Sequence, residues 1–270
     1  MADTDALFSR SISELYDQYL GPLLFEPYAR ELAARLAGTT SGRVLETAAG
    51  TGVLTRELVG ALPESVEILA TDLNQPMLDH AASRTSTSRV KWRQADAHSL
   101  PEGDGEFKAV VCQFGVMFFA DRVGAYREAH RVLAPGGLLA VSVWDRIEHN
   151  ELAVVVTSAL GEMFPDDPPR FLERVPHGYH DQVLVERELK DAGFADISIT
   201  CVAKRSVAAN ARDPAIGFCQ GSPLRNEIEA RDKGRLSEAT EVAAAAIVNR
   251  FGNGPVDGKM QGYIVTAVRR

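Results

Sequence analysis

The stretch from Gly42 to Leu58, GRVLETAAGTGVLTREL, constrains the fold of this chain more than any other. Val44 and Leu45 predict a short apolar strand, small residues fill the turn that follows, and an amphipathic helix begins at Val53. Glycines let the backbone approach a ligand closely, and the start of a helix presents unpaired N–H groups. The stretch therefore predicts an α/β domain with a ligand site at the carboxyl end of its sheet.

Strand and helix patterns continue to alternate after this turn. Short apolar strands are expected at about 43–47, 66–71, 90–94, 107–112 and 138–144, with helices between them, among them 53–61 and 123–133. Such alternation is typical of a doubly wound parallel sheet, because right-handed crossovers place helices on both faces. Two further strands at 197–203 and 263–268 flank a helical stretch at 213–251 and predict a final hairpin. The expected fold is a seven-stranded, mostly parallel, Rossmann-like α/β sheet with helical cap insertions.

The chain is expected to form one core with helical additions. Residues 1–40 are interpreted as an N-terminal lid, in which 1–13 are irregular and 14–36 form two helical pieces broken at Gly21-Pro22. Residues 41–203 plus 258–270 form the α/β core, and 204–257 form an insertion that is part of a cap. A lid and an ordinary packing helix share the same pattern of leucine and aromatic residues, so both interpretations stay open for the N-terminal helices.

Four polar side chains follow successive strands of the expected sheet: Glu46, Asp72, Asp96 and Gln113. Because the carboxyl ends of parallel strands lie along one edge, we expect these side chains to converge. This edge is the predicted ligand site.

The composition excludes several classes of protein. The 270 residues carry a net charge of −8, which argues against a large nucleic-acid interface. No apolar run reaches the ~20 residues that span a bilayer, and the polar N-terminus does not read as a signal peptide. Three widely spaced cysteines indicate free thiols in a reducing compartment. We expect a cytoplasmic protein without a membrane or nucleic-acid partner; the oligomeric state stays open, with a homodimer as one option.

Five sequence blocks resemble class I S-adenosylmethionine-dependent methyltransferases of the small-molecule type. They are VLETAAGTG (44–52), ATDLNQPML (70–78), RQADAHSLP (93–101), FKAVVCQFGVMFF (107–119) and RVLAPGGLLAVSVW (131–144). The family's first loop usually has a glycine where this chain has Ala48. The resemblance implies methyl transfer from S-adenosyl-L-methionine to a small acceptor, with S-adenosyl-L-homocysteine as product. Aromatic residues beyond position 145 suggest that the acceptor is partly hydrophobic.

The resemblance also implies roles for individual residues. Glu46 would face the amino group of the methionine part, with Ala48, Gly50 and Gly52 forming the loop and Gln113 nearby. Asp72 would accept the ribose hydroxyls, although an N-cap role is the alternative. Leu73 and Met77 would face the adenine, whose exocyclic amine and ring nitrogen would meet Asp96 and the N–H of Ala97. Tyr16 and Tyr19 share a helical face and either close over the cofactor or pack in the core.

The resemblance implies that methyl transfer needs little from protein side chains beyond alignment of the two reactants, because a sulfonium methyl group is already electrophilic. If the acceptor needs a general base, the sequence offers His149 and His177 as weak candidates. We expect no metal site, since the histidines lack a clear third ligand. Two alternatives remain: a cofactor-binding protein of the same fold without turnover, and an NAD-dependent oxidoreductase. The second is disfavoured because the loop lacks the third glycine of the dinucleotide fingerprint.

Overall fold

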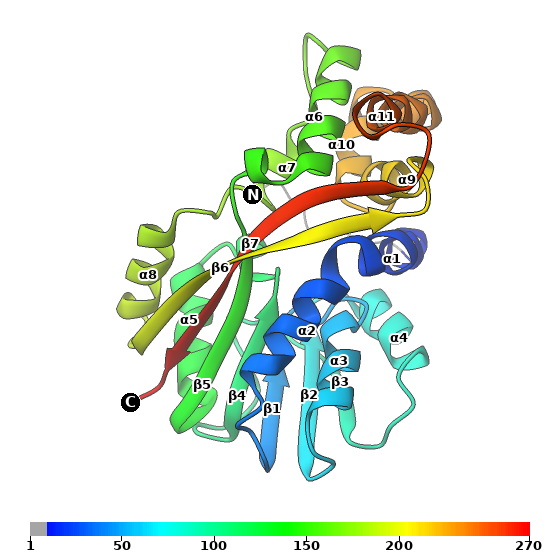
Figure 1. Ribbon diagram of the computed structural model, residues 1–270. Coiled ribbons are helices and arrows are strands. Elements are labelled where there is room, and N and C mark those ends of the chain that lie inside the picture. Colours follow the sequence, from blue (N-terminus) through cyan, green and yellow to red (C-terminus); the bar gives the residue numbers. More distant parts are fainter. Residues whose placement is uncertain (1–9) are drawn as a thin grey trace.

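The computed structural model describes residues 10–270 and contains a single sheet flanked by helices (Figure 1). The strands are β1 (Gly42–Glu46), β2 (Val66–Asp72), β3 (Val90–Gln94), β4 (Phe107–Gln113), β5 (Leu133–Trp144), β6 (Ala195–Ala208) and β7 (Val256–Val268). The α-helices are α1 (Arg10–Leu15), α2 (Glu26–Arg35), α3 (Val53–Ala61), α4 (Gln75–Ser83), α5 (Arg122–Val132), α6 (Glu151–Met163), α7 (Phe171–Arg174), α8 (Gln182–Asp191), α9 (Arg212–Gln220), α10 (Leu224–Arg231) and α11 (Leu236–Phe251). The remaining helical segments are a π-helix, η1 (Tyr16–Phe25), and the 3-10 turns η2 (Val116–Phe118), η3 (Ile147–His149) and η4 (Lys233–Arg235).

The sheet confirms the expected fold class. Its seven strands lie in the order β3-β2-β1-β4-β5-β7-β6. Strands β1 to β5 pair with one another in parallel, whereas β7 pairs antiparallel with both β5 and β6. The chain reverses its direction of winding beside β1, so β1 and β4 are the neighbours at the switch point. Ligands of open α/β sheets bind outside the strand ends at such a point.

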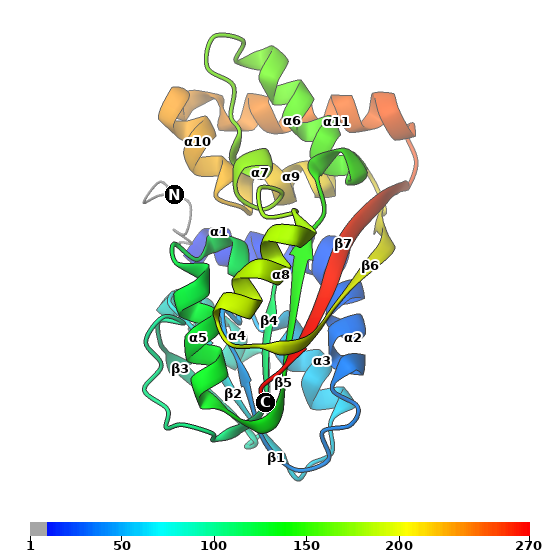
Figure 2. The same cartoon turned by 90° about the vertical axis from the view of Figure 1, so that its left-hand side faces the viewer.

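Helices cover both faces of the sheet, as Figure 2 shows: α2 and α3 pack on one face, and α5 and α8 on the other. The central strands are buried on both faces and therefore consist mainly of aliphatic residues. Helices α6, α7, α9, α10 and α11 form a cap beyond the carboxyl end of the sheet, which the long strands β6 and β7 reach (Figure 1). The cap therefore stands over the edge where the sequence places the ligand site.

The N-terminal helices differ from the expected broken pair. The helical backbone already begins at Arg10 and continues through Gly21 and Pro22 into α2 without interruption. Proline lacks an N–H and clashes with the preceding turn of an α-helix. The wider π-helical turn accommodates it, and the N–H of Glu26 donates to the carbonyl oxygen of Gly21, five residues back. Of the residues expected to be irregular, 1–9 lie outside the described part of the chain.

Several strand and helix limits also differ from those expected. Strand β5 begins at Leu133, because Leu133 pairs with Phe107 before the register shifts at a bulge. Strand β6 ends at Ala208 and strand β7 begins at Val256, so both ends of the segment 204–257, predicted to be an insertion, belong to strands.

The helices between β6 and β7 pack closely on the N-terminal segment. An added Cβ at Gly217 would lie 2.7 Å from Leu20 Cδ2, so a larger residue there would force the Leu20 side chain to shift. Over residues 10–270, no helix combines the length and apolarity that crossing a membrane requires.

Candidate functional site

The loop after β1 turns sharply beneath the N-terminal segment. Ala48, Gly50 and Gly52 all have positive φ angles, of 52°, 55° and 76°. Glycine adopts this conformation freely, whereas alanine is strained in it. The methyl group of Ala48 lies over Gly115, where an added Cβ would come within 2.5 Å. The loop therefore keeps its shape despite the missing glycine, and the space for Ala48 comes from Gly115.

Glu46 lies at the bottom of a recess beneath this loop. We call it the inner recess; it is lined by residues that include Tyr16, Phe25, Glu46, Ala48, Gly50 and Gln113. Glu46 is 1% exposed and accepts a hydrogen bond of 2.6 Å from Thr55 Oγ1. Burial raises the pKa of its carboxyl group to about 8, against the opposing effect of that hydrogen bond. A cationic ligand in the recess would stabilise the ionised form.

Gln113 supplies a second acceptor in the inner recess. Its Nε2 donates to the carbonyl oxygen of Phe25 at 2.8 Å, which fixes the amide. Its Oε1 is buried and has no partner among the described residues. A buried acceptor without a donor is unfavourable, so this atom fits a ligand that brings N–H groups. An ammonium group between Glu46 and Gln113 would satisfy both side chains.

Asp72 is held rigidly at the end of β2. Its Oδ2 accepts the backbone N–H of Gly50 at 2.8 Å, and its Oδ1 accepts the backbone N–H of Asn74 at 2.8 Å. Burial is the largest influence on this carboxyl group and raises its pKa in spite of these hydrogen bonds. Asn74, and not Asp72, is the N-cap of α4. Asp72 lines a second hollow and still has lone pairs to offer to hydroxyl groups there.

This second hollow, the outer cleft, continues from the inner recess through Tyr16, Ala48, Gly50 and Gln113. Leu73, Met77, Asp96 and Ala97 also line it. Leu73 is 58% exposed, which leaves a large apolar side chain ready to be covered by a flat ligand. Partial burial acts to raise the pKa of Asp96, but hydrogen bonds from the backbone and ring of His98 lower it overall.

The structure separates two predicted residues from the others. Tyr19 lines a different hollow, with Pro22 and Pro214, and does not face the cleft. Gly52 does not line either part of the cofactor site; an added Cβ there would lie 3.0 Å from Ala81 and Trp92. The remaining predicted cofactor-binding residues line the inner recess or the outer cleft.

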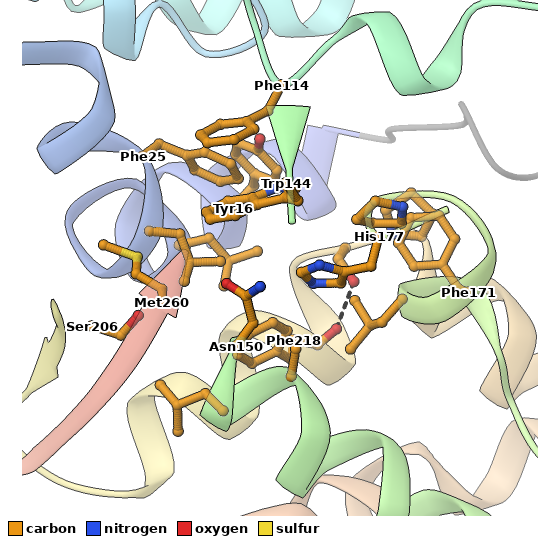
Figure 3. Close-up of a pocket in the computed structure, with 18 of the residues that line it drawn as sticks. Tyr16, Phe25, Phe114, Trp144, Asn150, Phe171, His177, Ser206, Phe218 and Met260 are labelled. Carbon is orange, nitrogen blue, oxygen red and sulfur yellow. Dashed lines mark hydrogen bonds between the residues drawn. The ribbon is translucent and has the colours of Figure 1, made fainter. Parts of the chain in front are cut away.

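A third hollow, the apolar cavity, lies between the sheet edge and the cap (Figure 3). It shares Tyr16, Phe114 and Phe118 with the outer cleft. The rings of Phe114 and Trp144 stack with centroids 3.8 Å apart and planes 4° apart, and form the wall nearest the sheet. Aromatic residues from the cap, among them Phe171 and Phe218, line the opposite wall.

The two candidate bases occupy different positions. His177 is 6% exposed and lines the apolar cavity. His149 does not line it; its side chain is 43% exposed, and its Nδ1 lies 2.6 Å from Asp145 Oδ2. Burial acts to raise the pKa of Asp145, but hydrogen bonds from His149, Tyr263 and Gln261 lower it to about 2. His149 and Asp145 thus form a hydrogen-bonded pair outside the cavity lining.

Sequence reasoning missed some of the lining residues. Phe114 and Phe118 connect the two hollows, yet the sequence presents them only as part of an apolar run after β4. Asn150 closes one end of the apolar cavity from the start of α6 and ties η3 to β7, where Gln261 lies. The sequence contains no signal for this contact, which joins residues far apart in the chain.

The geometry defines a class of protein: a Rossmann-like fold in which an acidic recess and an open cleft at the strand ends lie beside a second, apolar cavity. Comparisons with known proteins agree. Residues 44–137 match the family model described as a methyltransferase domain. The ubiquinone/menaquinone biosynthesis C-methyltransferase UbiE of Shewanella sp. (strain ANA-3) is 27% identical over 215 residues, covering 74% of this chain and 86% of that protein.

Two solved structures share the fold. A methyltransferase structure from Bacillus halodurans C-125 matches with a TM-score of 0.56 and 18% identity, over 88% of this chain and 98% of that one. Phosphoethanolamine N-methyltransferase 2 of Haemonchus contortus, solved with S-adenosylhomocysteine, matches with a TM-score of 0.62 and 16% identity, over 97% of this chain and 58% of that one. Together these matches support this chain as a class I S-adenosylmethionine-dependent methyltransferase. S-adenosyl-L-methionine is its cofactor, and its reaction is methyl transfer.

Proposed function

We propose that this enzyme methylates a small, partly hydrophobic molecule that binds in the apolar cavity. The observation that carries this proposal is the junction of the two hollows. The outer cleft, where the cofactor fits, meets the apolar cavity at Tyr16, Phe114 and Phe118. An acceptor in the cavity would therefore face the methyl group across this junction. Alignment of the two reactants supplies much of the acceleration in such a displacement.

The acceptor groups of the site support a specific arrangement of the cofactor. Glu46 and the free Oε1 of Gln113 would hold the ammonium group of the methionine part. Asp72 would accept the ribose hydroxyls, and the exposed Leu73 would cover one face of the adenine, near Met77, Asp96 and Ala97. When bound, the cofactor supplies an electrophilic methyl group on a sulfonium. The protein contributes orientation, exclusion of water and an apolar surface for the acceptor.

The boundaries of the cap and the cellular context remain proposals as well. We treat α9, α10 and α11 as part of the acceptor cap, because Phe218 from α9 lines the apolar cavity. A cytoplasmic location and a possible homodimer are predictions that fractionation and light scattering would test. The C-methyltransferase relatives from Shewanella belong to ubiquinone and menaquinone biosynthesis, and those names are consistent with an apolar acceptor here.

Two measurements test the proposal. Calorimetry with S-adenosylhomocysteine is expected to detect binding to the wild-type protein, and NADH is expected not to bind. Incubation with S-adenosylmethionine labelled in the methyl group and a cell extract should then give a labelled, organic-extractable small molecule. Cofactor binding without any labelled product would favour a binding protein without turnover. Binding of NADH in place of S-adenosylhomocysteine would favour an oxidoreductase.

A further inference from the structure

The imidazole of His177 has one nitrogen fixed as a donor. Its Nδ1 lies 2.7 Å from the backbone carbonyl oxygen of Asp145, and a carbonyl oxygen only accepts, so Nδ1 carries the hydrogen. Burial lowers the pKa of His177 to about 4, and the hydrogen bond to Asp145 opposes this only in part. The ring is therefore neutral near pH 7, and Nε2 keeps its lone pair.

The surroundings of His177 maintain this state. The charged or titratable groups that act on it are His180, Asp145 and Glu148, and the ring of Trp144 lies with its centroid 5.9 Å away. The carboxylate of Asp145 is already bound by His149 Nδ1 and Gln261 Nε2, each at 2.6 Å. The charge of Asp145 acts to raise the pKa of His177, but the burial of the ring outweighs it.

Figure 3 shows the ring of His177 directed into the apolar cavity, between Trp144 and Asn150. Two other polar groups of the lining already have partners. Asn150 Nδ2 donates to the carbonyl oxygens of Arg146 and Gln261, and its Oδ1 accepts the N–H of Gln261. Ser222 donates to the carbonyl oxygen of Phe218. Nε2 of His177 is thus, beside the hydroxyl group of Ser206, an acceptor that an incoming molecule can use in the cavity.

The charged residues of the cavity lining also restrict which molecules can bind. Among the described lining residues there is no aspartate or glutamate, and Lys259 is the cationic side chain. A cationic amine would lose its hydration without meeting a negative charge, which is costly in an apolar cavity. A neutral or anionic molecule with a flat apolar body suits the stacked aromatic walls.

We infer that the methyl acceptor is a flat apolar compound with a weakly acidic hydroxyl group, phenolic or enolic, which donates its hydrogen to Nε2 of His177. This inference rests on the proposed function and specifies its acceptor. As the hydroxyl oxygen, or the conjugated carbon that it activates, takes the methyl group, one proton must leave the acceptor. His177 receives the hydroxyl proton on Nε2 and returns it to solvent afterwards, so the overall reaction releases one proton per methyl group.

Three simple naphthalene compounds test the selectivity. Calorimetry on the protein loaded with S-adenosylhomocysteine compares 2-naphthol, 2-methoxynaphthalene, which cannot donate, and 2-(aminomethyl)naphthalene, which is cationic. We expect 2-naphthol to bind about tenfold more tightly than its methyl ether, as the loss of one hydrogen bond to a buried acceptor predicts, and the amine to bind most weakly. Equal affinities for the three, or no binding of 2-naphthol, would overturn the inference.

A matched pair of variants locates the acceptor atom. His177→Asn keeps a donor for the carbonyl of Asp145 but removes Nε2, so it should abolish the preference for 2-naphthol while the methyl ether binds as before. His130→Asn makes the same change on α5, beside Phe194 and outside the cavity lining, and should keep the preference. If His177→Asn retains the preference, the assignment to His177 is wrong.

The two proposals fail in different ways. Absence of S-adenosylhomocysteine binding would count against the proposed function itself. Normal cofactor binding with no discrimination between the naphthol and its ether would remove only the inference about the acceptor. The pH profile is a further readout: the preference for 2-naphthol should disappear as the pH falls toward 4, where Nε2 becomes protonated.

Discussion

The buried carboxyl group of Glu46 lowers the free energy of unfolding, and this destabilisation depends on the pH. Its pKa rises from 4.5 in the unfolded chain to about 8 in the folded protein, because the carboxyl group is buried. Between these values the folded state holds more protons than the unfolded state, so stability falls as the pH rises. The free energy of unfolding falls by ~1.4 kcal/mol per pH unit in this range. Between pH 5.5 and 7.5 the destabilisation by Glu46 therefore grows by ~3 kcal/mol.

The substitution Glu46→Gln removes this titration while it keeps the shape and the hydrogen bond from Thr55. We expect the variant to be more stable than the wild type at pH 7.5, and the difference between the two to shrink by ~3 kcal/mol at pH 5.5. Urea unfolding followed by tryptophan fluorescence at both pH values measures the two differences. Parallel pH dependences of the wild type and the variant would refute the reasoning.

The same substitution should weaken the site. Because a bound ammonium favours ionised Glu46, binding of S-adenosylhomocysteine to the wild type should release close to one proton at pH 7. Calorimetry in two buffers of different ionisation enthalpy measures that proton. Glu46→Gln should release none and bind about ten- to a hundredfold more weakly at pH 8, as expected for the loss of a charge-assisted hydrogen bond. Unchanged proton release in the variant would show that another group titrates.

Further predictions concern the loop, the N-terminal segment and the cleft. Ala48→Gly should raise the free energy of unfolding by ~1 kcal/mol in urea denaturation, because it relieves the positive φ of 52°. Asp17→Asn should lower it by ~2 kcal/mol and speed hydrogen exchange in residues 16–25, because buried Asp17 binds Arg56 Nη2 at 2.9 Å and thereby ties η1 to α3. Leu73→Ala should weaken S-adenosylhomocysteine severalfold in calorimetry, whereas Val207→Ala, with the same 58% exposure outside the cleft, should not.

The sequence predicted the sheet well because its signals are local. Each parallel strand is an apolar run that ends at a polar residue. The carboxyl ends of these strands lie along one edge of the sheet regardless of the conformation of the connecting loops. Glu46, Asp72 and Gln113 could therefore be predicted from their positions in the chain. The π-helix could not, because Gly21-Pro22 normally indicates a break. Its continuity depends on contacts with α9 that exist only in the folded protein, such as the approach of Leu20 to Gly217.

The apolar cavity was harder to predict, for a physical reason that also bears on its function. Its walls come from η1, the end of β5, the segment before α8, and α9. No local pattern relates these segments, and a histidine in any one of them resembles a surface residue until the others enclose it. His177 becomes a neutral acceptor only because the end of β5 supplies a carbonyl oxygen and the cap removes water. Under the two proposals above, acceptor choice would be set by packing between distant segments, whereas cofactor binding would be set by one short loop and the strand ends beside it.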